Sequence, residues 1–437
     1  MHDLRRQALE SGKTLSRKAR SRQSSAPSSR GASAANSRAH SRVASRQASD
    51  NEDDNLSDET SWSVNSIDDL LASEDLAAPT DAWIQDLGDR IQLIIDRKRS
   101  SGQGREETLA AYNYILMAHY TRDEIAGQVS QLYPAIARSL KGGSEKETLL
   151  ALKAISLTVI TVPSDTIYDD MERPLKNIIS DSESPAVKAA AVHTLGTLVS
   201  FGGAAEGEIE EVMEFLLEIV ESDGENVDAY DAADVVMAAE EEWGFLATQL
   251  DDLEPQTHDA MEAFVEQLSS SDTNVAVAAG ENIALLYEKA AAPADDESDS
   301  EEEDVDDAGD PKAGKRYDVY WKEKELVEQL EHLAKISGRS ISKKERKTLH
   351  TNFSDILHSV ENPSHGPRYN SAIDQESGKR YGSRLAVRLH RTGEMRIDKW
   401  WKMHRLHALR RILQGGFIVH YEKNEVVFES LPIMMSR

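Results

Sequence analysis

Between residues 81 and 292, apolar residues recur at the three- and four-residue spacing of amphipathic α-helices. The pattern is clear in EETLAAYNYILMAHY, KETLLALKAISLTVI and PAVKAAAVHTLGTLVSF. Turn-forming residues such as Gly142-Gly143 and Pro163-Ser164 separate these stretches. The pattern therefore predicts a series of long helices joined by short turns.

The helical stretches also repeat along the chain. Similar segments are spaced 40, 38, 42 and 47 residues apart and begin at Glu107, Glu147, Pro185, Val227 and Asn274. This period, with Ala and Gly where helices must approach closely, is typical of an armadillo/HEAT-like α-solenoid. We expect about five helix pairs over residues 80–292 from this period. The alternative is a helical bundle without repeats.

Residues 315–437 show a mixed pattern that predicts a small α+β C-terminal module. One helix is expected over 317–336, and a second begins after Ser342, which has capping-box spacing to Glu345. SRLAVRLH alternates apolar and basic residues, which predicts a strand that pairs with MRI in a hairpin. FIVHY and EVVFES predict a second hairpin near the end of the chain.

Between these hairpins, DKWWKMHRLHALRRILQ predicts a helix capped by Asp398 and ended by Gly415-Gly416. Its apolar arc is expected to face the hairpins and consists of Trp401, Leu406, Leu409, Ile412 and Leu413. The opposite side carries Trp400, His404, His407 and Arg411. An indole beside imidazoles and a guanidinium would suit stacking on a base and holding a phosphate. The alternative is that Trp400 packs on the solenoid or on another helix.

Charge is distributed unevenly along the chain. Residues 1–49 carry 11 Lys and Arg against 2 acidic residues, residues 50–311 carry 14 against 61, and residues 312–437 carry 25 against 15. An acidic body between two basic ends indicates a polyanionic partner that is bound at the ends. Within residues 379–411 there are 11 basic and 2 acidic residues, which favours structured RNA as that partner.

The predicted RNA-binding residues form two sets. The first lies on the C-terminal helix and comprises Lys399, Trp400, Lys402, His404, Arg405, His407, Arg410 and Arg411. The second crowds the first turn of the helix after Ser342, where the helix dipole disfavours cations, and comprises Lys343, Lys344, Arg346 and Lys347. The alternative interpretation is that water and salt solvate these charges.

Three segments are expected to lie outside the folded domains. Residues 1–49 are expected to be a disordered, basic, Arg/Ser-rich tail, and residues 293–314 a disordered acidic linker. Residues 50–79 are expected to be an acidic linker or a docking segment. Arg-x-x-Ser spacing and acidic flanks predict phosphorylation at Ser33, Ser41, Ser45, Ser49, Ser298 and Ser300. Chance matches are the alternative.

Several function classes are disfavoured. The chain has no cysteine, which excludes a disulfide scaffold, a thiol nucleophile and a Cys-ligated metal site. It has no P-loop, GxGxxG, GxSxG or HExxH motif, so we expect no enzymatic activity, cofactor, metal or small-molecule substrate. The most apolar run, 149–162, is too short to cross a bilayer and contains Lys153. We expect a soluble intracellular protein without a membrane partner.

Four segments together resemble the interferon-related developmental regulators. They are LSDETSWSVNSIDDLLA, WIQDLGDRIQLIIDRKRSSGQGREETLAAY, SKKERKTLHTNFSDIL and IDKWWKMHRLHALRRILQGGFIVHYEKNEVVFE. The resemblance covers roughly residues 50–437, and the sequence style is fungal. The longer Arg/Ser tail and the acidic run 294–311 depart from the family pattern. The resemblance implies an armadillo-type fold without enzymatic activity.

The resemblance also implies two roles. One is ribosome binding with repression or dormancy of translation. For this role our hypothesis is that the C-terminal module contacts rRNA and the solenoid contacts ribosomal proteins. The other is transcriptional co-regulation, in which the solenoid recruits corepressor or histone deacetylase complexes. The basic ends favour the first role and a cytoplasmic location, while the second would place the protein in the nucleus. A third hypothesis, an acidic histone-chaperone-like binder, would require the run 294–311.

Overall fold

The fold is described here from a computed structural model. It describes residues 82–97, 100–230, 232–291, 316–335, 343–373, 375, 378, 380–390 and 393–432. All of them belong to one compact unit, Ser63–Arg437. The predictions for residues 1–49, 50–79 and 293–314, including the six serines, lie outside the described residues.

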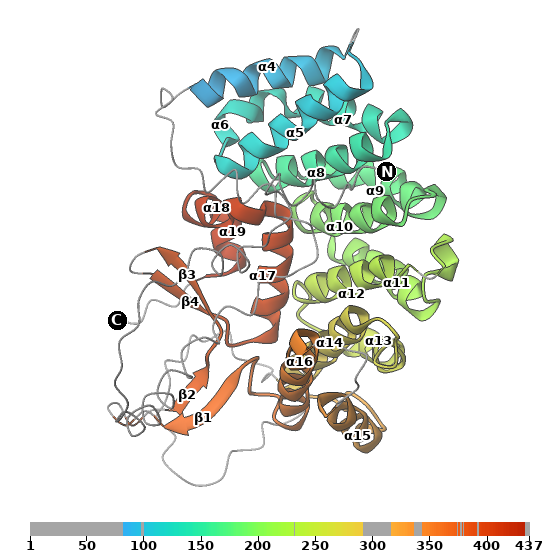
Figure 1. The fold of residues 1–437 in the computed structure, drawn as a ribbon, viewed down its shortest axis with the longest axis vertical. Coiled ribbons are helices and arrows are strands. Elements are labelled where there is room, and N and C mark those ends of the chain that lie inside the picture. The colour runs from blue at the N-terminus through green and yellow to red at the C-terminus, as the bar shows by residue number, and fades with distance from the viewer. Residues whose placement is uncertain are drawn as a thin grey trace, which may run out of the picture. The chain divides into compact units, whose positions relative to one another are not determined.

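Ten helices form the first five pairs of a stack, each pair with one outer and one inner helix (Figure 1). The outer helices are α4 (Ala82–Asp96), α7 (Val129–Gly142), α9 (Ile167–Asp181), α11 (Glu206–Glu221) and α13 (Glu254–Gln267). The inner helices are α5 (Gly102–Ala118), α8 (Glu145–Thr161), α10 (Pro185–Phe201), α12 (Ala233–Ala247) and α14 (Thr273–Ala291). Short turns of helix, α6 (Arg122–Ile125), η1 (Ala126–Gln128) and η2 (Glu225–Val227), lie between them. Each inner helix packs on the next, which confirms the predicted stacked-helix fold.

Serine begins three successive inner helices. The hydroxyls of Ser101, Ser144 and Ser184 each accept a hydrogen bond from the backbone N–H three residues later, at the start of α5, α8 and α10. Such a cap satisfies one of the N–H groups that a helix leaves free at its first turn. The repeat is therefore visible in the caps as well as in the apolar positions.

A sixth pair continues the stack beyond residue 292. Helices α15 (Glu323–Ala334) and α16 (Lys343–Glu361) pack on each other, and α16 packs on α14. Phe353 and Ile356 of α16 are buried, and a Cβ atom at Gly280 of α14 would contact Ile356. The described residues thus form six helix pairs, one more than about five expected from the period. The domain boundaries themselves stay predictions.

Two antiparallel hairpins follow the last pair. Strand β1 (Tyr369–Ile373) pairs with β2 (Arg380–Ser383), and β3 (Ala386–His390) pairs with β4 (Gly393–Arg396). In the second hairpin Val387 lies opposite Met395, and both side chains are buried. This second hairpin is the one predicted from SRLAVRLH and MRI, whereas the β1–β2 hairpin was not predicted.

The chain then returns to the stack through α17 (Trp400–Leu413), η3 (Gln414–Gly416), α18 (Phe417–Lys423) and α19 (Glu425–Ser430). The prediction of strands at FIVHY and EVVFES is wrong, because both segments are helical. The side chain of Asn424 accepts a hydrogen bond from the N–H of Val426 and so begins α19. Burial of Tyr421 and Val427 against the stack overrides the β-propensity of these residues.

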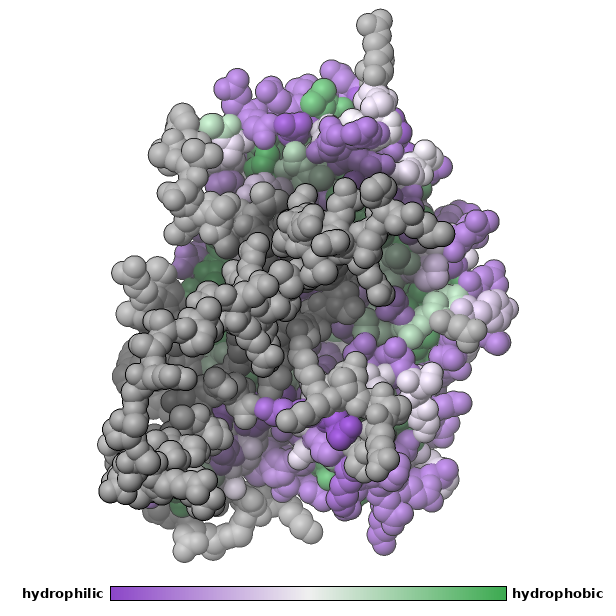
Figure 2. Space-filling model, viewed as in Figure 1, coloured by the Kyte–Doolittle hydropathy of each residue, from purple (hydrophilic) through white to green (hydrophobic). Residues whose placement is uncertain are grey.

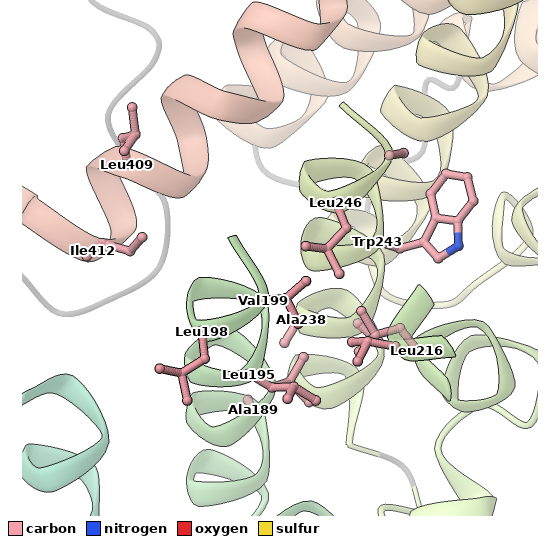
Figure 3. Close-up of a cluster of buried hydrophobic side chains, with 14 of the residues drawn as sticks. Ala189, Leu195, Leu198, Val199, Leu216, Ala238, Trp243, Leu246, Leu409 and Ile412 are labelled. Carbon is pink, nitrogen blue, oxygen red and sulfur yellow. The ribbon is translucent and has the colours of Figure 1, made fainter. Parts of the chain in front are cut away.

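Helix α17 lies along the inner helices and contacts α8, α12 and α14, while α18 contacts α5. Leu409 and Ile412 of α17 share a buried cluster with Leu198 of α10 and Leu246 of α12 (Figure 3). Hydrophilic residues cover the edge formed by the outer helices α9 and α11 (Figure 2). None of the helices in the described ranges has the length and apolarity needed to traverse a bilayer.

Candidate nucleic-acid interface

The N-terminus of α17 is capped by a carboxylate from the stack. Glu288 of α14 accepts hydrogen bonds from the backbone N–H groups of Trp400 at 2.8 Å and Trp401 at 3.2 Å. Burial raises the pKa of Glu288, although Lys399 and the two N–H groups act to lower it. A carboxylate at this position satisfies free N–H groups and complements the positive end of the helix dipole.

The C-terminus of α17 is capped by a basic side chain of the stack. Lys153 of α8 donates hydrogen bonds to the carbonyl oxygens of Arg411 at 2.8 Å and Ile412 at 2.6 Å. Burial and the nearby Arg411 lower the pKa of Lys153 to about 7. Both ends of α17 are therefore held by ionisable side chains of the stack, and these side chains come from repeats far apart in sequence.

The C-terminal segment in turn binds the ends of inner helices. Its side chains donate hydrogen bonds to backbone carbonyls near the C-termini of α5, α8 and α12. The pairs are His420 with Leu116 (2.7 Å), Asn424 with Ile160 (2.8 Å) and Arg405 with Thr248 (2.8 Å). Because one segment, residues 400–431, joins helices of several repeats, we call it the C-terminal clamp.

The guanidinium of Arg411 lies between two carboxylates of α12. It contacts Glu241 at 2.9 Å and also pairs with Glu242, which is almost fully buried and is held by His193 at 2.9 Å. Burial acts to lower the pKa of Arg411, but Glu242 and Glu241 outweigh it and raise that pKa. Arg411 thus belongs to a buried ion-pair network that joins the clamp to the stack.

Two histidines of α17 also face the stack. His404 is 6% exposed, with Nε2 at 3.3 Å from the carbonyl oxygen of Glu281, and burial lowers its pKa to about 4. His407 lies 3.8 Å from the Glu281 carboxyl group, and burial lowers its pKa to about 3. Burial raises the pKa of Glu281 to about 8. Burial thus favours the uncharged form of all three side chains, and the described residues include no cluster suited to a metal ion.

Trp400 has no free face for a base. Its ring is 2% exposed, and its Nε1 donates a hydrogen bond to the hydroxyl of Ser359 at 2.8 Å. The side of α17 that was expected to meet a ligand packs on α12 and α14 instead, so the predicted orientation of this helix is wrong. The physical reason is that the stack offers carboxyl groups at Glu241, Glu242 and Glu281 that match the polar side of α17.

The remaining predicted RNA-binding residues occupy different surroundings. Lys402 pairs with Asp398 at 2.7 Å, and Lys399 lies 3.5 Å from the carbonyl oxygen of Ser364. Arg410 and Arg346 are half-buried, and Lys347 is exposed. The side chains of Lys343 and Lys344 lie outside the described residues. Whether any member of the two sets binds RNA stays a prediction.

An exposed aromatic–cation pair on the β1–β2 hairpin was missed. Tyr381 is 42% exposed, and the guanidinium of Arg384 lies 5.1 Å from the centre of its ring. Arg384 itself is exposed, as is Arg396 on the neighbouring strand β4. The signal in the sequence was the segment KRYGSR, which places a tyrosine among three basic residues. The hairpin therefore presents an exposed aromatic ring beside cations, whereas on α17 Trp400 is buried and Trp401 is half-buried.

The chain is similar to a known protein family and to a yeast protein. A family model described as "Interferon-related developmental regulator" matches residues 47–361. The match ends at the last residue of α16, so the hairpins and the C-terminal clamp follow it. An uncharacterized protein of the fission yeast Schizosaccharomyces pombe is 26% identical over 349 residues, which cover 79% of this chain and 73% of the yeast protein.

Proposed function

The chain belongs to the interferon-related developmental regulator family, and from this premise we propose that it is a non-enzymatic, ribosome-associated regulator of translation. The observation that carries the proposal is the combination of charge and exposed aromatic surface after residue 379. Residues 379–411 hold 11 basic and 2 acidic residues, although Lys402, Arg405 and Arg411 among them bind other groups of the protein. Tyr381 is exposed beside Arg384. Unpaired RNA bases stack on such rings, and basic residues bind the phosphates.

The contact with rRNA is assigned to the hairpins, because the polar side of α17 is occupied. Tyr381 would stack on a base, while Arg384 and Arg396 would neutralise phosphates. Lys399 and Lys347 extend the basic character of the same C-terminal region. RNA thus remains the proposed partner of the C-terminal region, but the proposed contact lies on the hairpins instead of α17.

The solenoid is assigned to protein partners. Residues 82–291 carry 39 acidic and 14 basic residues, and such a surface repels phosphate and attracts basic protein segments. The same property supports the second candidate function, a nuclear co-regulator that recruits corepressor or histone deacetylase complexes. The two functions differ in where the essential surface lies, on the hairpins for ribosome binding and on the solenoid for co-regulation.

Sedimentation of the full chain through sucrose gradients tests the proposal. We expect the protein to migrate with ribosomal particles, to be released by RNase and to dissociate steeply as salt rises. The double variant Tyr381→Ala with Arg384→Ala should lower the cosedimenting fraction at least several-fold. The matched control is Tyr230→Ala with Arg122→Ala, which removes an exposed tyrosine and an exposed arginine from the solenoid.

Two outcomes contradict the proposal. One is cosedimentation that the hairpin variant leaves at the level of the solenoid control. The other is the absence of ribosomal particles from the purified complexes, together with nuclear partners that resist RNase. The second outcome would support the co-regulator function.

A further inference from the structure

A groove separates the outer helices α7 and α9. It encloses about 1440 Å³, which exceeds the volume of a typical small-molecule pocket. Its floor is apolar and includes the buried side chains of Tyr133, Met171 and Val187. Half-buried Ala137 and Ile178 line its two sides. The groove is therefore large enough and apolar enough to hold several residues of a peptide.

Each of the two helices contains an interior proline that lines the groove. Pro134 lies inside α7 and Pro174 inside α9, 40 residues later, which is the spacing of the repeat. A proline has no N–H, so the carbonyl four residues earlier loses its usual helical donor. These carbonyls belong to Ser130 and Asp170, and both residues line the groove. The repeat thus places a proline at equivalent positions on the two walls of the groove.

The rim of the groove is mainly acidic. The exposed residues Glu145, Asp170, Asp181 and Glu183 line it together with Lys141 and Arg173. This excess of carboxylates adds to the acidic charge of the surrounding solenoid. A phosphate-bearing ligand would be repelled, whereas a cationic ligand would be attracted.

We propose that the groove between α7 and α9 is a docking site for a basic peptide segment of another protein, with leucine-like side chains spaced between arginines or lysines. The apolar side chains would fill the floor, and the cations would pair with Asp170 and Glu183. This inference does not depend on RNA binding by the hairpins, because the groove lies on other helices.

Fluorescence anisotropy with the full-length protein tests the proposal. The probe is a labelled 14-residue synthetic peptide in which leucine recurs every third or fourth position among arginines. Two peptides of equal length serve as comparisons, one with glutamate for arginine and one with serine for leucine. We expect the basic leucine peptide to bind at least tenfold more tightly than either.

Two groove variants locate the binding. Asp170→Lys with Glu183→Lys reverses the rim charge and should weaken binding at least tenfold. Its control, Glu211→Lys with Glu214→Lys, makes the same change in charge on exposed positions of α11 and should have little effect. Ala137→Trp fills the groove without changing charge, and Ala186→Trp places the same side chain at an exposed position outside it.

The binding results of the variants and their controls decide whether the peptide occupies the groove. Loss of binding in both groove variants but in neither control supports the site, provided that far-UV circular dichroism shows all four proteins folded. Equal binding by Ala137→Trp and Ala186→Trp would overturn it. Equal binding of all three peptides, or a stronger response to a labelled oligouridylate that the groove variants abolish, would also overturn it.

Discussion

The ammonium group of Lys153 lies 2.6 Å from the carbonyl oxygen of Ile412, although 259 residues separate them. Lys153 belongs to the second inner helix, and Ile412 to the last turn of α17. The contact caps the C-terminus of α17, the negative end of its dipole, as Glu288 caps the N-terminus, the positive end. It also makes a lysine of the repeat domain sensitive to the presence of the C-terminal clamp.

Stability should depend on pH through Lys153. Burial lowers its folded-state pKa from 10.5 to about 7, so between these values the unfolded chain binds a proton that the folded chain does not. Stability should therefore rise with pH above 7, by at most about 1.4 kcal/mol per unit. Lys153→Met should lack this rise. Urea unfolding at pH 7, 8 and 9 measures the difference, and the exposed Lys146→Met should behave as the wild type does.

Removing the cation at position 411 should destabilise the protein strongly. Arg411→Leu leaves Glu242 buried without its guanidinium partner, which typically costs about 3–5 kcal/mol. An exposed arginine of the stack offers a control, because Arg122→Leu should cost less than about 1 kcal/mol. Equal unfolding midpoints for the two variants in urea would contradict the assignment. Charge reversal at Arg411 would disrupt the clamp itself, so loss of RNA binding in such a variant would not show that Arg411 contacts RNA.

Acid should weaken the packing of α17 through His404. Burial lowers its pKa from 6.5 to about 4, so the unfolded chain takes up the proton first as the pH falls. Its contribution to stability should be lost between pH 6.5 and 4 and be constant below that. His404→Gln should reduce this loss. Glu281, with its raised pKa of about 8, acts in the opposite direction, but it does so in both proteins and largely cancels in their comparison.

Gly244 should tolerate no side chain. A Cβ atom there would overlap the side chain of Asn282 on α14 and the ring of His404 on α17. Gly244→Ala should therefore cost about 1–3 kcal/mol, as overpacking does in other cores. Gly207→Ala on α11 meets no neighbouring atom and should be neutral or stabilise by up to about 1 kcal/mol. Thermal unfolding of the two variants under the same conditions compares them directly.

The repeat was predictable because the buried side of each inner helix can be recognised from the residues of that helix alone. Apolar residues spaced along α8 and α10, and serine caps at Ser144 and Ser184, lie within a short stretch of sequence. The sixth pair was missed as part of the stack because an acidic run precedes it and its helices carry more charge. The acidic run also interrupts the repeat period, so the period did not indicate that the two helices after it belong to the stack.

The orientation of α17 could not be predicted from its own residues. By periodicity His404, His407 and Arg411 form a polar face, and a polar face is usually assigned to solvent. Their partners Glu241 and Glu281 lie on two other helices, more than 120 residues earlier in the sequence. A signal did exist, because three consecutive glutamates, 240–242, interrupt the run of apolar residues in α12. Their significance depends on a contact that only the folded chain reveals.

The path of the C-terminal clamp sets the order in which the protein is completed. Neighbouring repeats contact each other locally, so they can assemble while the chain is still being synthesised. His420 and Asn424 bind residues that lie 304 and 264 positions earlier, so these contacts form long after the helices they join have been synthesised. A chain that ends before residue 400 would lack the clamp and would expose the sides of α8, α12 and α14 that α17 covers.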